Sequence, residues 1–362
     1  MTDTLPRAAL NRAVLARQLL LARADLPAER AIERLAGMQA QAPNPPYVGL
    51  WARLAGFAPE QLSQLVTERK VVRIALMRGT IHLVTAADCL LLRPVVQPVL
   101  DRGLRNTYGR QLVGLDLDEV AAYGRELVEQ RPLTFAELGE QLAGRWPDHA
   151  ADALAPVVRT RVPLVQVPPR GLWNTSGQAA HTSAETWLGA ALPQPSVDEA
   201  VLRYLAAYGP ASVRDAQAWS GLTRLREVFD RLLPRLVTCT DESGTTLYDL
   251  PDAPRPAADT PAPVRLLGEF DNMLLSYADR TRVLSEPHRA RVFTVNGIIR
   301  ATVLVDGYVA GMWRLARDRD TAAVTVELFQ PVSPAIQDEI VAEAAALLTF
   351  AAPAAVHDVR LV

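Results

Sequence analysis

The chain has 362 residues, of which 49% are hydrophobic and 22% are charged, and its formal net charge is −2. This balance is typical of a globular protein with about two to four domains, and it argues against both a disordered chain and a protein coated in positive charge. No apolar stretch reaches the roughly 20 residues of a membrane span, and the first residues lack the layout of a signal peptide, so we expect a cytoplasmic protein that does not enter a membrane.

Cysteine and lysine usage narrows the chemistry. The two cysteines, Cys89 and Cys239, fall in separate predicted units and form no spaced cluster, so we expect buried thiols and no metal site. Lys70 is the only lysine, which leaves Lys70 and the N-terminal amine as the groups able to form a Schiff base. We expect no cofactor.

The N-terminal unit is predicted to contain three helices followed by a strand pair. Periodicity and turn residues indicate helices over 7–23, 28–38 and 59–69, and strands over 71–77 and 80–85. This is the element order of a winged helix, whose helix-turn-helix part presents one helix to a DNA groove.

Two glutamines follow the second of these helices, where a proline cluster at 43–46 prevents the helix from continuing. On the extended backbone expected there, Gln39 and Gln41 point to one side and Ala40 to the other. Two converging amides offer carbonyl oxygens and NH2 groups that can hold and orient one water molecule. The alternative is a pair of solvated glutamines in a loop.

The same element order recurs twice more along the chain. The second unit is predicted to have helices over 117–129, 134–144 and 149–159, a strand over 164–167 and a looser wing through 171–173. The third is predicted to have helices over 197–208, 212–220 and 223–233 and strands over 236–240 and 245–250. Equivalent breaks at 131–134 and 209–212 each supply a Ser or Thr cap to the middle helix, which supports a tandem repeat.

The last hundred residues are mostly β. A proline-rich linker at 251–263 precedes strands over 301–305 and 308–314, which turn at Asp306-Gly307. A strand over 323–329, a helix over 334–350 and a strand over 356–361 follow. The prediction is an α+β protein with three tandem winged helix-turn-helix units and a C-terminal β-barrel-like domain, divided as 1–114, 115–195, 196–250, 251–263 (linker) and 264–362.

Several blocks in this order resemble the winged-helix DNA glycosylases of the AlkZ type, over nearly the whole chain. The blocks are MetGlnAlaGln (38–41), LeuTrpAlaArg (50–53), MetArgGlyThrIleHisLeuVal (77–84), GlyProAlaSerValArgAspAlaGlnAlaTrpSerGly (209–221), ArgLeuLeuGlyGluPheAspAsnMetLeuLeuSerTyrAlaAspArg (265–280) and ThrValLeuValAspGlyTyrValAlaGlyMetTrp (302–313). In that family a Gln-hydrophobic-Gln motif is catalytic, which the resemblance assigns to Gln39 and Gln41. A sister branch carries Asp at the second position, so Gln41 places this chain nearer the branch associated with self-resistance to crosslinking natural products such as azinomycin B.

The resemblance implies a glycosylase that removes N7-alkylguanine from duplex DNA, including crosslinked guanine. Such a base is already cationic and leaves without protonation, so positioned water and oriented amide dipoles are sufficient for its removal. With one lysine in the chain, we expect a monofunctional enzyme. We also expect it to be a monomer.

Further residues are candidates for DNA contact. Arg78 and His82 lie at the first wing, and Asn272, Arg280 and Arg282 lie in a block shared with the family; His82 has the alternative of a hydrogen bond within the sheet. Asp271 either orients a glutamine or bonds a nearby turn. Arginine pairs at 159 and 161, 224 and 226, and 289 and 291 are possible phosphate contacts or solvated helix faces.

Two other functions remain open. One is a transcription regulator that binds undamaged DNA, although such proteins usually read a two-fold operator as dimers, and three different units in one chain provide no such symmetry. The other is a scaffold whose winged helices bind protein, because a fold does not determine function.

Overall fold

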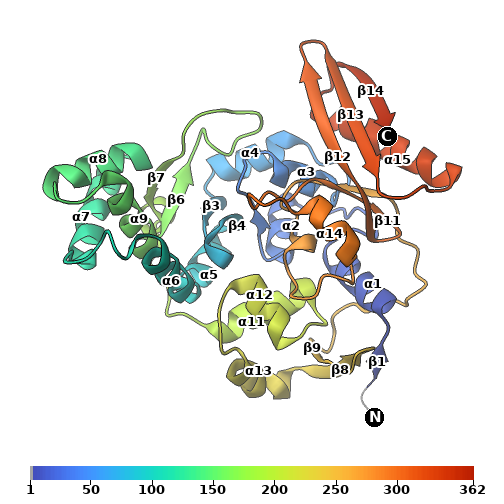
Figure 1. The fold of residues 1–362 in the computed structure, drawn as a ribbon, viewed down its shortest axis with the longest axis horizontal. Helices are drawn as coiled ribbons and strands as arrows, with labels where there is room; N and C mark the ends of the chain where they lie inside the picture. The colour runs from blue at the N-terminus through green and yellow to red at the C-terminus, as the bar shows by residue number, and fades with distance from the viewer. Residues whose placement is uncertain (1–2) are drawn as a thin grey trace.

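The structure, a computed structural model, describes residues 3–362 and has the predicted mixture of helices and sheets. Figure 1 shows the second unit extending to one side of the first, the third unit below, and the C-terminal sheet projecting at the upper right. None of the helices in the described part of the chain is long and apolar enough to cross a membrane.

The first unit differs from the prediction around the glutamines. Its elements are β1 (Thr4–Leu5), α1 (Arg7–Arg17), α2 (Ala28–Arg34), β2 (Met38–Gln39), α3 (Pro45–Trp51), α4 (Pro59–Thr67), β3 (Val71–Ala75), η1 (Met77–Gly79) and β4 (Ile81–Thr85). The first two helices end earlier than predicted because Leu19 and Ala36 adopt left-handed φ angles of 58° and 53°. The prolines do not only break a helix, since Pro45 and Pro46 begin α3, where the first turn needs no N–H donor.

The second unit agrees with the prediction in its three central helices and differs in its wing. Helices α5 (Ala86–Val95) and α6 (Gln97–Tyr108) follow β4 and still belong to the first unit. The elements of the second unit are α7 (Leu117–Gln130), β5 (Leu133–Thr134), α8 (Phe135–Arg145), α9 (Ala151–Arg161), β6 (Leu164–Val167), β7 (Ala180–Ser183) and α10 (Ala184–Leu188). The partner of β6 is β7, which lies beyond the predicted 171–173 segment.

A six-stranded sheet in the order β2-β4-β3-β6-β7-β5 joins the first and second units. The hairpin of the first unit meets that of the second where β3 pairs with β6 in antiparallel fashion. Arg73 lies opposite Gln166, and Gln166 lies opposite His181, so the three residues occupy one row across three adjacent strands.

The third unit has the predicted order of helices and strands. It consists of α11 (Val197–Tyr208), α12 (Val213–Ser220), α13 (Arg226–Leu232), η2 (Leu233–Arg235), β8 (Val237–Asp241) and β9 (Thr246–Asp249). Ser212 caps α12 in a capping box with Asp215, as the Gly-Pro-Ala-Ser break indicates. Strand β1 adds to β8 in parallel, so the start of the chain belongs to this sheet.

The C-terminal region is an open sheet, and the expected barrel-like closure is wrong. Its elements are β10 (Arg265–Leu267), η3 (Asn272–Leu274), α14 (Glu286–Val292), β11 (Thr302–Val305), β12 (Tyr308–Asp318), β13 (Thr321–Leu328), α15 (Pro334–Ala351) and β14 (Val356–Leu361). The strands follow the order β10-β11-β12-β13-β14, and within residues 3–362 the two edge strands do not pair with each other. Helix α15 packs on β10, β13 and β14, so a helix covers the apolar face that barrel closure would otherwise bury.

Two apolar cores hold the molecule together. The larger one joins residues of the first and third units and the C-terminal region and also takes in Val165 and Ala184 of the second unit, and the smaller one lies mainly among α7, α8 and α9. Cys89 is buried in the larger core, and Cys239 is half-buried. The six-stranded sheet therefore spans a boundary between separately packed bodies.

Candidate active site

Strand β2 holds Gln39 on a short extended segment beside β4. Gly37 begins the segment at φ +84°, and a Cβ atom there would lie 2.5 Å from Cγ1 of Val84, so this turn requires glycine. Gln39 pairs with His82 across the ladder. Ala40 is fully buried, and its N–H donates to the Ile81 carbonyl at 2.8 Å.

Both glutamine amides contact the turn between β3 and β4. Nη2 of Arg78 donates to Oε1 of Gln39 at 2.8 Å, and the backbone N–H of Ile81 donates to Oε1 of Gln41 at 3.3 Å. These two groups only donate, so the oxygen of each amide must face them, and each oxygen keeps a second acceptor position. Gln39 is 7% exposed, whereas Gln41 is exposed. Each amide thus accepts a hydrogen bond from a group within residues 78–81, but Gln41 lines the large cavity described below whereas Gln39 lines a separate small pocket.

The C-terminal region clamps the glutamine strand from the other side. Oδ1 of Asn272 accepts from the N–H of Gln39 at 3.2 Å, and its Nδ2 donates to the Gly37 carbonyl at 2.6 Å. The neighbouring Asp271 forms a buried, bidentate ion pair with Arg53, with both contacts at 2.8 Å. Asp271 therefore anchors η3 and does not contact either glutamine through its carboxylate.

Arg73 holds the backbone between the two glutamines. Its Nη2 donates to the Ala40 carbonyl at 2.8 Å, and its Nε donates to Oε1 of Gln166 at 3.0 Å. The side chain is 2% exposed, and burial lowers the pKa of Arg73 to about 10, which leaves it charged at neutral pH.

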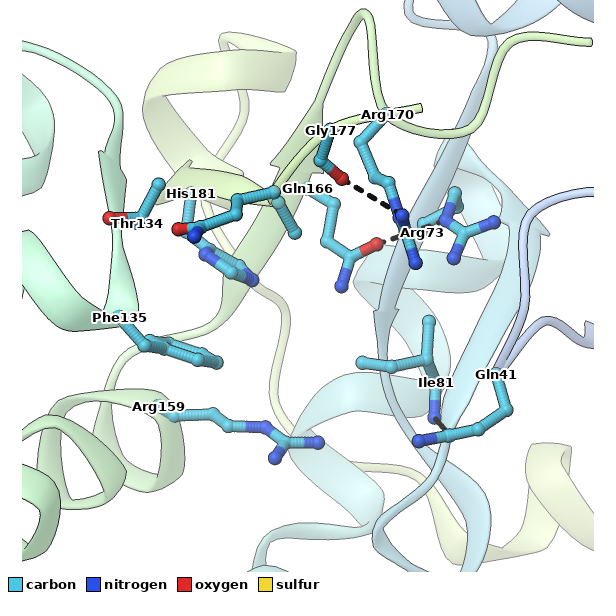
Figure 2. A pocket seen from close by; sticks show the side chains of 12 residues that line it. Gln41, Arg73, Ile81, Thr134, Phe135, Arg159, Gln166, Arg170, Gly177 and His181 are labelled. Carbon is cyan, nitrogen blue, oxygen red and sulfur yellow. Dashed lines mark hydrogen bonds between the residues drawn. The ribbon is translucent and has the colours of Figure 1, made fainter. Parts of the chain in front are cut away.

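A cavity of about 470 Å³ opens beside Gln41, between the first and second units. Figure 2 shows Gln41, Ile81 and Arg73 on one side and the Phe135, His181 and Arg159 group on the other. The full lining is Gln41, Arg73, Ile81, Thr134, Phe135, Arg159, Gln166, Arg170, Gly177, Gln178, Ala179 and His181. The lining therefore carries three arginines and no carboxylate.

The two candidates at the first wing support the glutamines from within. Arg78 is half-buried and also donates to the Trp219 carbonyl, and burial lowers its pKa to about 10. His82 is 1% exposed, with Nδ1 at 3.0 Å from the Thr80 carbonyl. Burial, and then the charge of Arg78, lower the pKa of His82 to about 3, so the imidazole is neutral.

The two C-terminal arginine candidates hydrogen-bond to backbone carbonyls and, within residues 3–362, to neither glutamine. Arg282 is buried, donates to the Pro210 carbonyl at 2.8 Å and lies over the Tyr277 ring at 4.1 Å. Arg280 is half-buried and donates to the Leu274 carbonyl at 2.8 Å. Of the predicted site residues, the structure brings together Gln39, Gln41, Arg78, His82 and Asn272, while only Gln41 lines the cavity.

The cavity residues that were not predicted from the sequence include Arg73, Gln166, Arg170 and His181. Two of them had a detectable signal. Arg73 interrupts the apolar run of β3, and Gln166 interrupts that of β6, and a lone polar side chain in an apolar strand needs a partner or a function.

Comparisons with known proteins agree on one family. The model of the DNA glycosylase AlkZ-like family matches residues 32–350. An interstrand DNA cross-link repair glycosylase of Streptomyces sahachiroi is 27% identical over 325 residues, which cover 83% of this chain and 85% of that protein. The solved structure of Streptomyces sahachiroi DNA glycosylase AlkZ has the same fold, with a TM-score of 0.82, 23% identity and coverage of 99% of this chain and 100% of that one. The chain belongs to the AlkZ-like family of DNA glycosylases.

Proposed function

We propose that this DNA glycosylase hydrolyses the N-glycosidic bond of N7-alkylguanine in duplex DNA, with Gln39 and Gln41 as its catalytic residues. The observation that carries the proposal is that both amides accept hydrogen bonds from residues 78–81, with Gln41 at the wall of an arginine-lined cavity without carboxylates.

A carboxylate-free site suits a base that is already cationic. N7-alkylguanine leaves as a neutral base without protonation, so the enzyme has to place water and stabilise an oxocarbenium-like sugar. In our proposal the exposed Gln41 holds the water through the acceptor position that Ile81 leaves free. The carbonyl dipole of Gln39 stabilises the oxocarbenium-like sugar from the buried side of the site. Weak bases of this kind restrict the enzyme to activated leaving groups.

We extend the proposal to guanines crosslinked between strands by a natural product such as azinomycin B. A relative named for interstrand crosslink repair supports this extension. A guanine tethered to the opposite strand cannot swing into a deep pocket, so an accessible catalytic group is required. The exposed side chain of Gln41 meets that requirement.

We also propose that the three units with helices followed by strands act as winged helices along the duplex. The recurring order of helices followed by antiparallel strands supports this reading, and the arginines of the cavity face the junction of the first two units. The proposed divisions are 1–114, 115–195 and 196–250, with 251–263 as the linker to 264–362.

The test is an incision assay on a duplex with one N7-methylguanine, in which alkali cleaves the abasic product. Wild type should cut the strand, and Gln39→Ala and Gln41→Ala should each lower the single-turnover rate at least tenfold. Gln64→Ala, on the exposed face of α4, is the matched control and should keep the wild-type rate.

Other outcomes favour other functions. Absence of cutting on methylated and on crosslinked duplexes, with tight binding to undamaged DNA, would favour a DNA-binding regulator. Cutting that is unchanged in both glutamine variants would place the chemistry elsewhere in the molecule.

A further inference from the structure

The floor of the cavity is a polar row built across three strands. Arg73 on β3, Gln166 on β6 and His181 on β7 are in register with one another and line the same cavity. Side chains in one row across adjacent strands share one face of a sheet. Three polar side chains on consecutive strands that line one cavity indicate a surface that binds a polar group.

The positive charge around this row has no counter-charge in the described chain. None of Arg73, Arg159 and Arg170 forms an ion pair among residues 3–362, and the cavity lining holds no Asp or Glu. Arg161, two residues after Arg159, instead lies 3.8 Å from a carboxylate oxygen of Asp101 and 3.6 Å from one of Asp118. Arginines without a carboxylate partner therefore lie in the cavity lining, whereas the nearby Arg161 has two carboxylates beside it.

Hydrogen-bonding groups in the cavity are also unused. His181 is 3% exposed and stacks on Phe135 with ring centroids 4.1 Å apart. Among residues 3–362, neither of its ring nitrogens has a hydrogen-bond partner within 3.5 Å and in good geometry, although the backbone of Leu133 lies near the ring. Burial lowers the pKa of His181 to about 4, so the ring is neutral and offers one donor and one acceptor. Arg159 makes one long contact, at 3.4 Å, with the Gly79 carbonyl. A buried polar group without a partner is costly unless a ligand completes its bonding.

We propose that this cavity binds a phosphodiester group of the DNA strand whose lesion lies against Gln41. Arg159 and Arg170, which are half-buried and face the cavity, supply the charge, and Gln166 and His181 supply neutral N–H donors. This site rests on the proposed function for its connection to the lesion, but it can be tested through binding alone.

Arg73 connects this site mechanically to the glutamines. One side chain bonds both Gln166 in the cavity floor and the Ala40 carbonyl between Gln39 and Gln41. A phosphate bound by this row of side chains therefore fixes the position of the DNA strand along the protein. It thereby determines which sugar faces the glutamines. Arg73 is a positioning residue in this arrangement.

The first test measures affinity for an undamaged duplex at several salt concentrations. Arg159→Gln and Arg170→Gln should each weaken binding about tenfold at low salt and reduce the salt slope by about one. Arg161→Gln, on the same helix as Arg159 but paired with carboxylates, should change affinity less than twofold. Arg159→Lys keeps the charge and should restore the slope, which separates loss of charge from misfolding.

The second test identifies the phosphate. Duplexes with one N7-methylguanine and a neutral methylphosphonate at successive positions are bound to the Gln41→Ala protein, in which excision should be slowed. They are also bound to the Gln41→Ala protein that carries Arg159→Gln or Arg170→Gln. At one or two positions, the methylphosphonate should weaken DNA binding by the Gln41→Ala protein about tenfold. At the same positions it should cause no further loss of affinity in the proteins that also carry an arginine substitution.

Two results would overturn the phosphate site. One is that, at every position, the loss of affinity from the methylphosphonate adds to the loss from the arginine substitution. This would show that no single phosphate contacts these arginines. The other is unchanged DNA affinity in the arginine variants with slower base removal, which would assign the cavity to the base or its adduct. Neither result decides whether Gln39 and Gln41 are catalytic, because that question is answered by the excision rates of the two glutamine variants.

Discussion

Arg78 donates through Nη2 to Oε1 of Gln39 at 2.8 Å and through Nη1 to the carbonyl of Trp219 near the C-terminal end of α12. One guanidinium thus links a glutamine of the first unit to the third unit. Its backbone has a left-handed φ of 58°, uncommon for a residue with a side chain, which aims the guanidinium inward from the β3–β4 turn. The orientation of the Gln39 amide therefore depends on contact between units distant in sequence.

Removing this contact should slow base excision without weakening DNA binding. In Arg78→Ala, Gln39 loses a charge-assisted hydrogen bond of about 1.5–3 kcal/mol, which corresponds to a rate loss of about tenfold to a hundredfold if the bond acts in the transition state. The measurement is the single-turnover excision rate beside the affinity for an undamaged duplex. Arg102→Ala is the control, since Arg102 donates to Gly221 at the same end of α12 but not to Gln39. A loss of affinity with an unchanged rate would instead make Arg78 a DNA ligand.

Asn272 should matter for both stability and excision. Asn272→Ala leaves the N–H of Gln39 and the carbonyl of Gly37 without their partner, at a cost of about 1–3 kcal/mol for each group that stays dry. Asn272→Asp can still accept from Gln39, but its buried carboxylate faces the Gly37 carbonyl and lies beside Asp271, so its free energy of unfolding in urea should fall at least as far as that of Asn272→Ala. Equal stability of all three proteins would contradict the clamp.

Segments with strong local signals were predictable from the sequence. The Gly-Pro-Ala-Ser break, the capping box at Ser212 and the Asp306-Gly307 turn correspond to helix α12 and to the β11–β12 hairpin. Strand β7 was not predictable, because its position depends on the loop that precedes it. In that loop Gly171 packs closely against Arg73, and a Cβ atom at this position would lie 2.7 Å from Cδ of the arginine. Such long-range contacts leave no local pattern.

The site was predictable to a similar degree. The prolines and the spacing of Gln39 and Gln41 indicated an extended pair of amides, and both contact one turn. Strand alternation assigns a side chain to a face but not what covers that face, so the sequence left His82 open between DNA contact and a hydrogen bond within the sheet. In the structure His82 is buried beside the Thr80 carbonyl. The cavity itself forms only when β6 pairs with β3.

The buried histidines should make the protein less stable as the pH falls below about 6.5. Burial lowers the pKa of His82 to about 3 and of His181 to about 4, from 6.5, so between these values the unfolded chain binds protons that the folded protein does not. Their contribution is present above pH 6.5 and is lost as the pH falls, by up to about 1.4 kcal/mol per pH unit for each group.

Urea unfolding at pH 7.5, 6.0 and 5.0 measures this slope. His82→Leu and His181→Phe should each flatten it, whereas His357→Gln, on the exposed face of β14, should leave it unchanged. If stability does not change from pH 7.5 to 5.0, the two imidazoles are not buried as neutral groups in solution.

The ion pair between Arg53 and Asp271 should be costly to break from one side. Asp271→Asn keeps an oxygen for the N–H of Met273 but leaves the buried Arg53 without a charge partner, at a cost of about 3–5 kcal/mol. The double variant Arg53→Met/Asp271→Asn removes the unpaired charge and should recover much of that loss in urea unfolding. A double variant less stable than Asp271→Asn would show that Arg53 acts through contacts other than this pair.

Lysine chemistry should play no part in excision. Lys70 is exposed and does not line the cavity. Its amine lies 2.8 Å from a carboxylate oxygen of Glu68, and the hydrogen bond and charge of Glu68 raise the pKa of the Lys70 amine and keep it protonated. Borohydride added during excision should therefore trap no protein–DNA adduct, while alkali still reveals abasic sites. Lys70→Ala should excise at the wild-type rate, and a lyase-competent glycosylase on its own substrate confirms that trapping works. An adduct in either form of this protein would contradict hydrolysis by water, because a covalent sugar–amine intermediate requires a nucleophilic amine and not a water held by amides.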